Sequence, residues 1–397
     1  MLKINYNSFF RIILILSAIK IIFSIYLGDE AIDMEWGIIN QNLVNFGEFS
    51  YYEIDSNRIP SIYMPPLYSY FLYSFSFLNL DQFLTTKLIL ITQCILSFIS
   101  ALVFFRLLRN YFDDGKAYII CIIYYIFPVN FYAASQISSV SLQVFCFIYF
   151  IYFLINLRCT KDYILFGLFS SFLILIRGEF WLLFILMIFF KIITDKKKIK
   201  KLLITLIVTS CVISPVIIKN YKIFDKLIIT KSFGYNLWRG NSEPLNINGN
   251  NFDKGEMVVN EFIRSGININ KFELYRDNFF LQKAKKSLID NPYMYINHYL
   301  KKFFAFSIFN FDSNYPNYYN PLIFIPEIII SLFAFFGILL SIFKNKNYDI
   351  LILVLYYLAL IPIFFILPRY KLFILPLYFI FASQFYFYLS NIFSKKQ

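Results

Sequence analysis

Long apolar runs alternate with short polar loops along most of the chain. Many runs reach or approach the roughly 20 residues that a helix needs to cross hydrocarbon. Inside lipid the backbone must satisfy its own hydrogen bonds, so each run is predicted to be an α-helix. The pattern predicts about ten transmembrane helices, at residues 9–27, 84–105, 117–133, 140–157, 162–177, 179–194, 201–219, 321–343, 350–367 and 372–393. No small-residue cleavage site follows the first run, so we expect it to remain as an anchor.

Charged residues in the loops orient these helices. Residues 191–201 carry six lysines and one aspartate, which predicts a cytoplasmic loop. Residues 28–64 carry seven acids and one base, Arg58, which predicts an external loop. Both termini are then cytoplasmic. Seven predicted helices precede the hydrophilic stretch 220–302, so this stretch is external if the N-terminus is cytoplasmic. Its positive charge does not argue against this, because loops of this length translocate largely regardless of charge.

One apolar run does not fit this topology. Residues 65–80 form a short run that begins with two prolines and would invert every later loop if it crossed the membrane. We expect it to lie at the outer interface or to dip partway in. The alternative is a tilted short helix that does cross, which would place the lysine-rich loop outside, against the charge rule.

The hydrophilic stretch divides the chain into three parts. The prediction is an N-terminal transmembrane module with a catalytic first external loop (28–83), an external loop domain, and C-terminal transmembrane helices, at residues 1–219, 220–302 and 303–397 respectively. Apolar spacing in the loop domain predicts an amphipathic helix over 272–288 and a second over 293–304.

Composition supports a multi-pass protein of the cell membrane. Of the 397 residues, 59% are hydrophobic and 15% charged, against about 25% charged in an average soluble protein. The net charge of +13 gathers at the ends of apolar runs, which indicates topology and not a nucleic-acid partner. The five cysteines have no metal-ligand spacing. The single histidine, His298, argues against His-rich metal sites and a Ser-His-Asp triad, and is expected on the surface of an amphipathic helix.

The first external loop holds the candidate catalytic carboxylates Asp29, Glu30 and Asp33. If residues 31–46 are helical, Trp36 lies on an apolar stripe and Asp33 on a neighbouring face. A carboxylate there can accept the proton of an attacking hydroxyl, or hold a divalent cation such as Mg²⁺ or Mn²⁺ against a phosphate. Taken alone, the acidic residues of this loop are better explained as the ordinary solvated charge of an external loop.

Basic residues at predicted outer helix ends are candidates for binding a lipid phosphate: Lys20, Arg177, Lys219, Arg369 and Lys371. Snorkelling to headgroups explains each of them individually. A structural ion pair with Glu179 explains Arg177 equally well. Pro65, Pro66 and Tyr68 would fix an aromatic helix at the headgroup layer, as an ordinary interfacial anchor does.

The order of motifs is more informative than any one of them. DMEWGIINQNLVNFGEFS, MPPLYSYFL, LIRGEFWLL, SPVIIKNYKIFDKLIITKSFGYNLWRGN, DNPYMYINHYLKKFF and PRYKLFILP follow one another along the chain. This succession resembles the GT-C superfamily of membrane glycosyltransferases, bacterial relatives of protein O-mannosyltransferases and lipid A aminoarabinose transferase. The resemblance runs from about residue 9 to residue 376. It implies an all-α polytopic GT-C-like fold with interfacial juxtamembrane helices.

The resemblance also implies roles for particular residues. Asp33 matches the acidic residue of the first external loop, with Asp29-Glu30 as an alternative alignment. Arg369-Tyr370 looks like the Arg-Tyr that helps to hold the donor phosphate. The substrate-binding stretch is matched by Lys219-Asn220-Tyr221 and Gly240-Asn241, with Lys in place of the usual Arg. No acid follows Pro128 in the second external loop, where members often have one, which puts metal binding between two acidic loops in doubt.

The expected function is an inverting transfer of a sugar from a polyprenyl-phosphate donor to a hydroxyl of a glycan, lipid or protein at the outer membrane face. Two alternatives stay open. One is a transporter or flippase of lipid-linked saccharides, which would show internal repeats and charges deep in the bundle. The other is a polysaccharide polymerase or ligase, which uses the same kind of lipid carrier.

Overall fold

The computed structural model describes residues 6–250, 255–313, 318–344 and 347–394, and nearly all of their regular structure is helical. Four segments are long and apolar enough to cross a membrane, judged by length and composition: Tyr6–Leu27, Gln82–Leu108, Lys196–Phe224 and Pro321–Phe343. Three further apolar helices are shorter: Val140–Ile155, Phe180–Thr194 and Tyr348–Ile363.

The helices of the bundle fall on the predicted apolar runs, with ends shifted by a few residues. They are α1 (Tyr6–Leu27), α4 (Gln82–Leu108), α5 (Asp114–Ile126), α6 (Pro128–Ala133), α7 (Val140–Ile155), α8 (Thr160–Ile176), α9 (Phe180–Thr194), α10 (Ile199–Phe224), α15 (Pro321–Phe343), α16 (Tyr348–Leu360) and α17 (Leu375–Ser394).

Proline interrupts two of the predicted helices. The run 117–133 breaks into α5 and α6 before Pro128, and the run 350–367 gives way after α16 to a 3₁₀ turn that contains Pro362. In both places the proline ring has no N–H to continue the helical hydrogen bonds. Helix α5 alone would extend only about 20 Å, short of the hydrocarbon thickness of roughly 30 Å. The expected total of ten crossings is therefore not confirmed.

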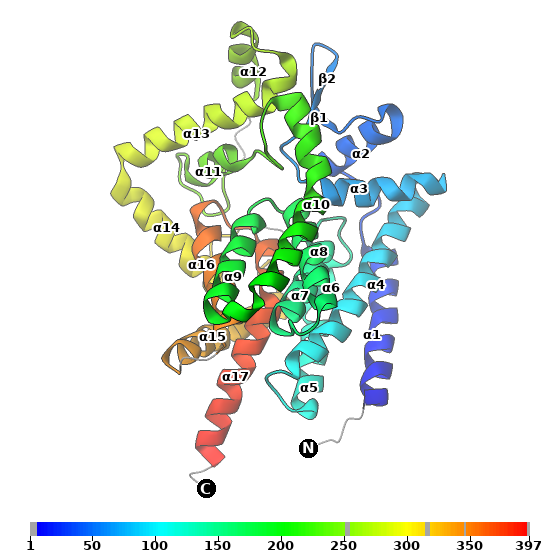
Figure 1. Ribbon diagram of the computed structural model, residues 1–397, viewed down its shortest axis with the longest axis vertical. Helices are drawn as coiled ribbons and strands as arrows, with labels where there is room; N and C mark the ends of the chain where they lie inside the picture. Colours follow the sequence, from blue (N-terminus) through cyan, green and yellow to red (C-terminus); the bar gives the residue numbers. More distant parts are fainter. Residues whose placement is uncertain (1–5, 251–254, 314–317, 345–346, 395–397) are drawn as a thin grey trace.

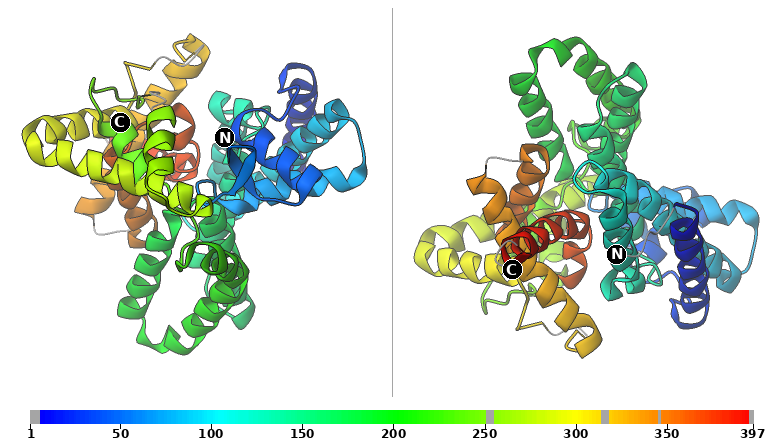
Figure 2. Two further views of the ribbon diagram at one scale, coloured as in Figure 1. Left: turned by 90° about the horizontal axis from the view of Figure 1, so that it is seen from above. Right: turned by 90° about the horizontal axis from the view of Figure 1, so that it is seen from below.

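Both ends of the chain lie at one end of the bundle, and the hydrophilic segments gather at the other (Figure 1). We call the latter the loop end; it is formed by residues 28–81, 225–250 and 255–302. Seen from above, the first loop and the helices of 272–307 lie on different sides of the molecule, and α8 to α10 project between them as a lobe (Figure 2).

The first loop contains α2 (Met34–Phe46), a hairpin of β1 (Ser50–Ile54) and β2 (Asn57–Pro60), and α3 (Pro66–Ser74). Helix α2 confirms the helix expected over 31–46. It ends at Gly47, whose φ of 69° is the left-handed conformation that glycine adopts at helix ends. The hairpin was not anticipated.

Helix α3 lies across the upper ends of α1 and α4 instead of running beside them (Figure 1). Its nine residues extend only about 14 Å, which is too short to cross a bilayer. This geometry agrees with the expectation that residues 65–80 stay on one side. Tyr68 anchors the helix, because it is fully buried and its hydroxyl lies 3.1 Å from Gln93 Oε1 on α4.

The second hydrophilic segment folds into α11 (Phe233–Asn241), α12 (Gly255–Arg264), α13 (Phe272–Asp290) and α14 (Pro292–Ser307). Helices α13 and α14 confirm the two amphipathic helices; α11 and α12 were not anticipated. The segment is bonded to the first loop, since the Lys231 N–H donates to the Ile62 carbonyl at 2.8 Å.

Distant parts of the bundle are joined by polar contacts as well as by apolar packing. Lys191, at the end of α9, forms an ion pair with Asp349, at the start of α16, over 2.8 Å. The Thr209 hydroxyl on α10 donates to the Gly167 carbonyl on α8 at 3.0 Å. Gly337 on α15 lies so close to α17 that an added Cβ would overlap the carbonyl oxygen of Phe381.

Candidate active site at the loop end

Two of the three candidate carboxylates lie close together at the start of the first loop. The Asp29 carboxylate accepts the Ile137 N–H at 2.6 Å, and the Asp29 N–H donates to the Ser135 carbonyl at 3.1 Å. Asp33 is exposed and precedes α2. Glu30 is exposed. The loop between α6 and α7, which contains Ser135 and Ile137 but no acidic residue, therefore positions Asp29 with its backbone.

The surroundings of Asp29 favour its protonated form. Burial raises the pKa of the Asp29 carboxyl, and the neighbouring Asp33 raises it further. The Ile137 N–H and the charge of Lys87 act in the opposite direction and lower the pKa in part. A raised carboxyl pKa moves the group toward the range in which it exchanges protons near neutral pH.

Three predicted phosphate-binding residues come together from distant segments. Arg177 lies in the turn between α8 and α9, and its guanidinium is 4.8 Å from the ring centroid of Tyr370. The Arg369 guanidinium is 6.0 Å from the same ring. Arg177 also forms the expected ion pair with Glu179, at 2.7 Å. The ion pair does not exclude a second role, because an Arg has five N–H donors.

Aromatic rings connect this cluster with the first loop. Tyr370 lies 5.8 Å from Phe365, ring to ring, and the Arg239 guanidinium of α11 lies 4.6 Å from the Phe365 centroid. Tyr63, which follows β2, lies 5.9 Å from Tyr235 of α11, ring to ring, and burial raises the pKa of Tyr63. The sequence did not predict this set of contacts, because no spacing motif connects residues that are more than a hundred positions apart.

Lys20 requires a correction. It is fully buried, and its ammonium donates to Ser97 Oγ at 3.1 Å and lies 4.0 Å from the Tyr125 ring centroid. These partners on α4 and α5 enclose it within the bundle. Lys20 therefore does not lie at a surface where it could contact a phosphate. The sequence indicates how far along α1 the residue sits but not which way it points.

Lys371 is likewise not presented to a ligand. Its side chain is buried between Glu327, at 3.2 Å, and the carbonyl oxygen of Ile308, at 2.5 Å. The charge of Lys371 is thus already balanced within the protein, in contrast to that of its exposed neighbour Arg369.

The predicted substrate-binding residues divide into two groups. Pro66, Tyr68, Asn220 and Asn241 are buried, while Pro65 is half-buried and Lys219 and Tyr221 are exposed. Asn220 Nδ2 donates to the Ile228 carbonyl at 2.8 Å, which closes the turn after α10. Lys219 lies 5.3 Å from the ring of Phe49, so it faces the first loop.

Asn241 joins α11 to the loop before α17. Its Nδ2 donates to the Ile363 carbonyl at 2.9 Å, and its Oδ1 accepts the ammonium of the fully buried Lys302 at 3.0 Å. Lys302 also donates to the carbonyls of Gly240 and Phe364, at 3.1 and 2.6 Å. The Gly240-Asn241 pair thus holds the backbone of the loop that carries Arg369.

Among the residues that the structure describes, no group of three or more His, Cys, Asp or Glu side chains is placed to hold a metal ion. Asp29 and Asp33 offer two carboxylates, and one oxygen of Asp29 already accepts a backbone N–H. Mg²⁺ is commonly held by one or two carboxylates together with substrate phosphates. The first loop fits a cation only in that shared manner.

No protein-family model and no curated protein matches the chain. Solved structures of the oligosaccharyltransferase of Archaeoglobus fulgidus have a similar fold. One is tethered to an acceptor peptide containing an NVT sequon; it matches with a TM-score of 0.58 and 14% identity, over 98% of this chain and 50% of that one. A complex with an inhibitory peptide and a dolichol-phosphate matches with a TM-score of 0.55 and 14% identity, over 96% and 50%. A complex with zinc and sulfate matches with a TM-score of 0.51 and 14% identity, over 96% and 49%.

The likeness extends over nearly the whole chain but only half of the transferase. The chain therefore spans about half the length of the structures that it matches. At 14% identity the shared property is the path of the backbone, since function resides in sites that one fold can carry in different forms. The chain has the GT-C fold, as the order of its motifs predicted.

Proposed function

We propose that this protein is a membrane glycosyltransferase that moves a sugar from a polyprenyl-phosphate donor to an acceptor hydroxyl at the external face of the cell membrane. The observation that carries the proposal is the fold shared with the oligosaccharyltransferase structures over 98% of the chain, with Asp29 and Asp33 both in the first loop. The solved relative in complex with a dolichol-phosphate supports a lipid phosphate as the donor carrier.

In this reaction the acceptor hydroxyl gives its proton to a first-loop carboxylate. Its oxygen attacks the anomeric carbon, and the bond from that carbon to the phosphate oxygen breaks, so polyprenyl phosphate leaves with the electron pair. Asp33 is the proposed base because it is exposed, and Asp29 is its rival because of its raised pKa. One attack from the face opposite the phosphate inverts the anomeric configuration.

Arg369, Arg177 and Tyr370 are the proposed ligands of the departing phosphate. The guanidinium groups of the two arginines can donate paired hydrogen bonds to phosphate oxygens, and the Tyr370 hydroxyl can donate one. Such fixed charges stabilise the negative charge that develops on the leaving group. A divalent cation held by Asp29 and Asp33 would add positive charge at the donor phosphate.

The test is transfer of a labelled sugar to cell-envelope acceptors by purified protein that retains its own lipid-linked donor, identified by mass spectrometry. Asp33→Asn should lower the rate by about 10²–10⁴-fold while the folded protein still retains the lipid. Asp55→Asn is the matched control, because Asp55 is exposed in the hairpin turn at φ 49°, a conformation that Asn tolerates.

If Asp29→Asn abolishes transfer and Asp33→Asn does not, the base is Asp29. A wild-type protein that retains the lipid-linked sugar but only moves it between leaflets would overturn the proposal in favour of a flippase.

A further inference from the structure

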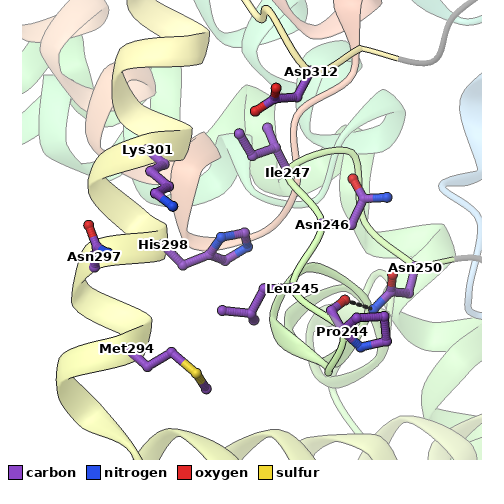
Figure 3. Close-up of a pocket in the computed structure, with 10 residues that line it drawn as sticks. All are labelled: Pro244, Leu245, Asn246, Ile247, Asn250, Met294, Asn297, His298, Lys301 and Asp312. Atoms are coloured by element: carbon purple, nitrogen blue, oxygen red, sulfur yellow. Dashed lines mark hydrogen bonds between the residues drawn. The ribbon is translucent and has the colours of Figure 1, made fainter.

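A cavity of about 490 Å³ opens between α14 and two loops (Figure 3). Residues 244–250 form one wall, α14 forms the opposite wall, and Asp312 lies at one end. The size is that of typical small-molecule sites, which enclose roughly 300–1,000 Å³. None of the candidate catalytic or phosphate-binding residues lines it.

Hydrogen bonds fix the loop wall in place. Asn250 Nδ2 donates to the carbonyls of Ser242 and Pro244, at 2.7 and 2.8 Å. Asn248 Nδ2 donates to the Asp312 carbonyl at 2.9 Å, which ties the wall to the end of the cavity. A site that is already formed loses little conformational entropy when a ligand binds.

The same wall is fastened to the loop that carries the proposed phosphate ligands. The Ile366 N–H donates to the Ile247 carbonyl at 2.9 Å. Gly249 has a φ of 78° and packs against the side chain of Phe365, where an added Cβ would lie 2.9 Å from Phe365 Cγ. The wall of the cavity and the loop leading to Arg369 and Tyr370 are therefore hydrogen-bonded and packed against each other.

His298 and Lys301 extend from α14 toward the loop wall (Figure 3). Burial lowers the pKa of His298 to about 4, so its ring is neutral at pH 7. His298 Nε2 lies 3.2 Å from the Gly240 carbonyl, which can only accept, so the proton is on Nε2 and Nδ1 is left as an acceptor. Lys301 supplies donors, Asp312 supplies acceptors and the Asn297 amide supplies both, while Asn246 Oδ1 already accepts the Asn248 N–H at 2.9 Å.

The remaining lining is apolar, from Leu245, Ile247 and Met294. A sugar ring has the matching chemistry, because its hydroxyls both donate and accept while its C–H groups are apolar. The lining holds one cation and one anion beside a neutral histidine, so it suits a neutral sugar better than an anionic one.

We propose that this cavity binds one or two neutral sugar residues of a saccharide acceptor, at a subsite away from the reacting hydroxyl. The proposal rests on the proposed glycosyltransferase function and names the acceptor class as glycan. Binding at such a subsite would hold the acceptor next to the loop that carries the proposed phosphate ligands, and so would contribute to orienting the two substrates.

The test measures binding without any transfer. Wild-type protein in a detergent without sugar headgroups is mixed with maltose, lactose or N,N′-diacetylchitobiose, and saturation transfer from protein to sugar is recorded by NMR. At least one disaccharide should bind, and Asn297→Ala and Lys301→Ala should each weaken that binding at least threefold. Asn278→Ala and Lys285→Ala are matched controls on α13, where both side chains are exposed, and should bind as the wild type does.

Equal binding in wild type and in both cavity variants, or binding of none of the three disaccharides, would overturn the proposal. So would a serine-containing peptide that binds in a manner dependent on Asn297, because the acceptor would then be protein. If no disaccharide binds but transfer still depends on Asp33, the proposed acceptor subsite is wrong and the proposed function stands. Retained binding with transfer independent of Asp33 and Asp29 removes only the proposed base.

Discussion

Glu273 illustrates how much one buried carboxyl does at the loop end. It is 2% exposed and accepts the N–H groups of Ile62 and Tyr63 at 2.5 and 2.6 Å and the Ser61 hydroxyl at 2.9 Å. Helix α13 thereby holds the end of the first loop. Burial raises the pKa of Glu273 to about 7, although these donors act to lower it.

This raised pKa predicts a pH dependence of stability. The folded protein holds the proton more tightly than the unfolded chain, whose carboxyl has a pKa of 4.5. The contribution to stability is therefore complete below about pH 4.5 and is lost as the pH rises toward 7. Relative to Glu273→Gln, the wild type should lose about 3 kcal/mol across this interval.

Thermal unfolding in detergent at several values between pH 4.5 and pH 8 would measure the loss. Glu53→Gln, at an exposed position of the hairpin, should follow the wild type. A difference between wild type and Glu273→Gln that stays constant with pH would contradict the prediction.

Replacing the two neighbouring lysines of α14 by methionine should affect stability very differently. Lys302→Met removes the ammonium that donates to Asn241 Oδ1 and to the Phe364 carbonyl, leaves the Gly240 carbonyl to His298, and should cost at least about 3 kcal/mol of stability. Lys301→Met should change stability by less than about 0.5 kcal/mol, because the side chain is exposed. Thermal unfolding of the two variants side by side checks this, and equal losses would contradict it.

At this scale the sequence predicted residue types better than their directions. Arg177 and Arg369, far apart in the sequence, both lie within 6.0 Å of the Tyr370 ring, and their proposed roles stay a prediction. Tyr68 and Asn241, in contrast, are fixed by internal hydrogen bonds. Which side of a helix faces inward depends on tertiary packing, and a single sequence does not contain that information in readable form.

At the scale of elements, glycines set how closely helices approach. An added Cβ on Gly337 would overlap a backbone carbonyl of α17, which cannot move unless the two helices separate. Gly337→Ala should therefore destabilise the protein by about 1–3 kcal/mol. Gly115→Ala is the matched control, since its Cβ would meet only Asp113 Oδ1, at 3.5 Å, and should be neutral or slightly stabilising.

Thermal unfolding of the two alanine variants is the measurement. A Gly337→Ala protein as stable as Gly115→Ala would show that α15 and α17 can part without cost.

Elements with a strong apolar period were predicted well, and others were not. The runs that became α1, α4 and α10 are long and apolar, so their type was clear from the sequence. The hairpin turns at Asp55 and Ser56, which have φ of 49° and 61°. The sequence did not predict it, because strands of five and four residues are too short to give a clear pattern among the surrounding acidic residues. Helix α11 is rich in glycine and asparagine, which disfavour helix, and tertiary contacts override that preference.

At the scale of the whole molecule, the two hydrophilic segments that were both predicted to be external lie at the same end of the bundle. Residues 28–81, 225–250 and 255–302 share one end, and the start of α1 and the end of α17 lie at the other (Figure 1). The side of the membrane on which the loop end lies stays a prediction.

Cysteine labelling in intact cells would measure that side. In a Cys159→Ser, Cys211→Ser background, which removes the exposed native thiols, Glu53→Cys should react with a membrane-impermeant maleimide. Lys197→Cys, between α9 and α10, should react only after permeabilisation. The opposite labelling would mean that the loop end faces the cytoplasm.

The ion pair between Lys191 and Asp349 has a consequence for biogenesis. Its two members are separated by about 160 residues of synthesis, which takes roughly 8–30 s at ordinary ribosome speeds. During that interval Lys191 has no partner on α16 and adds its positive charge to the neighbouring lysines, which favour retention on the cytoplasmic side. The same side chain would thus guide insertion of α9 first and lock it to α16 afterwards, once its orientation has been decided.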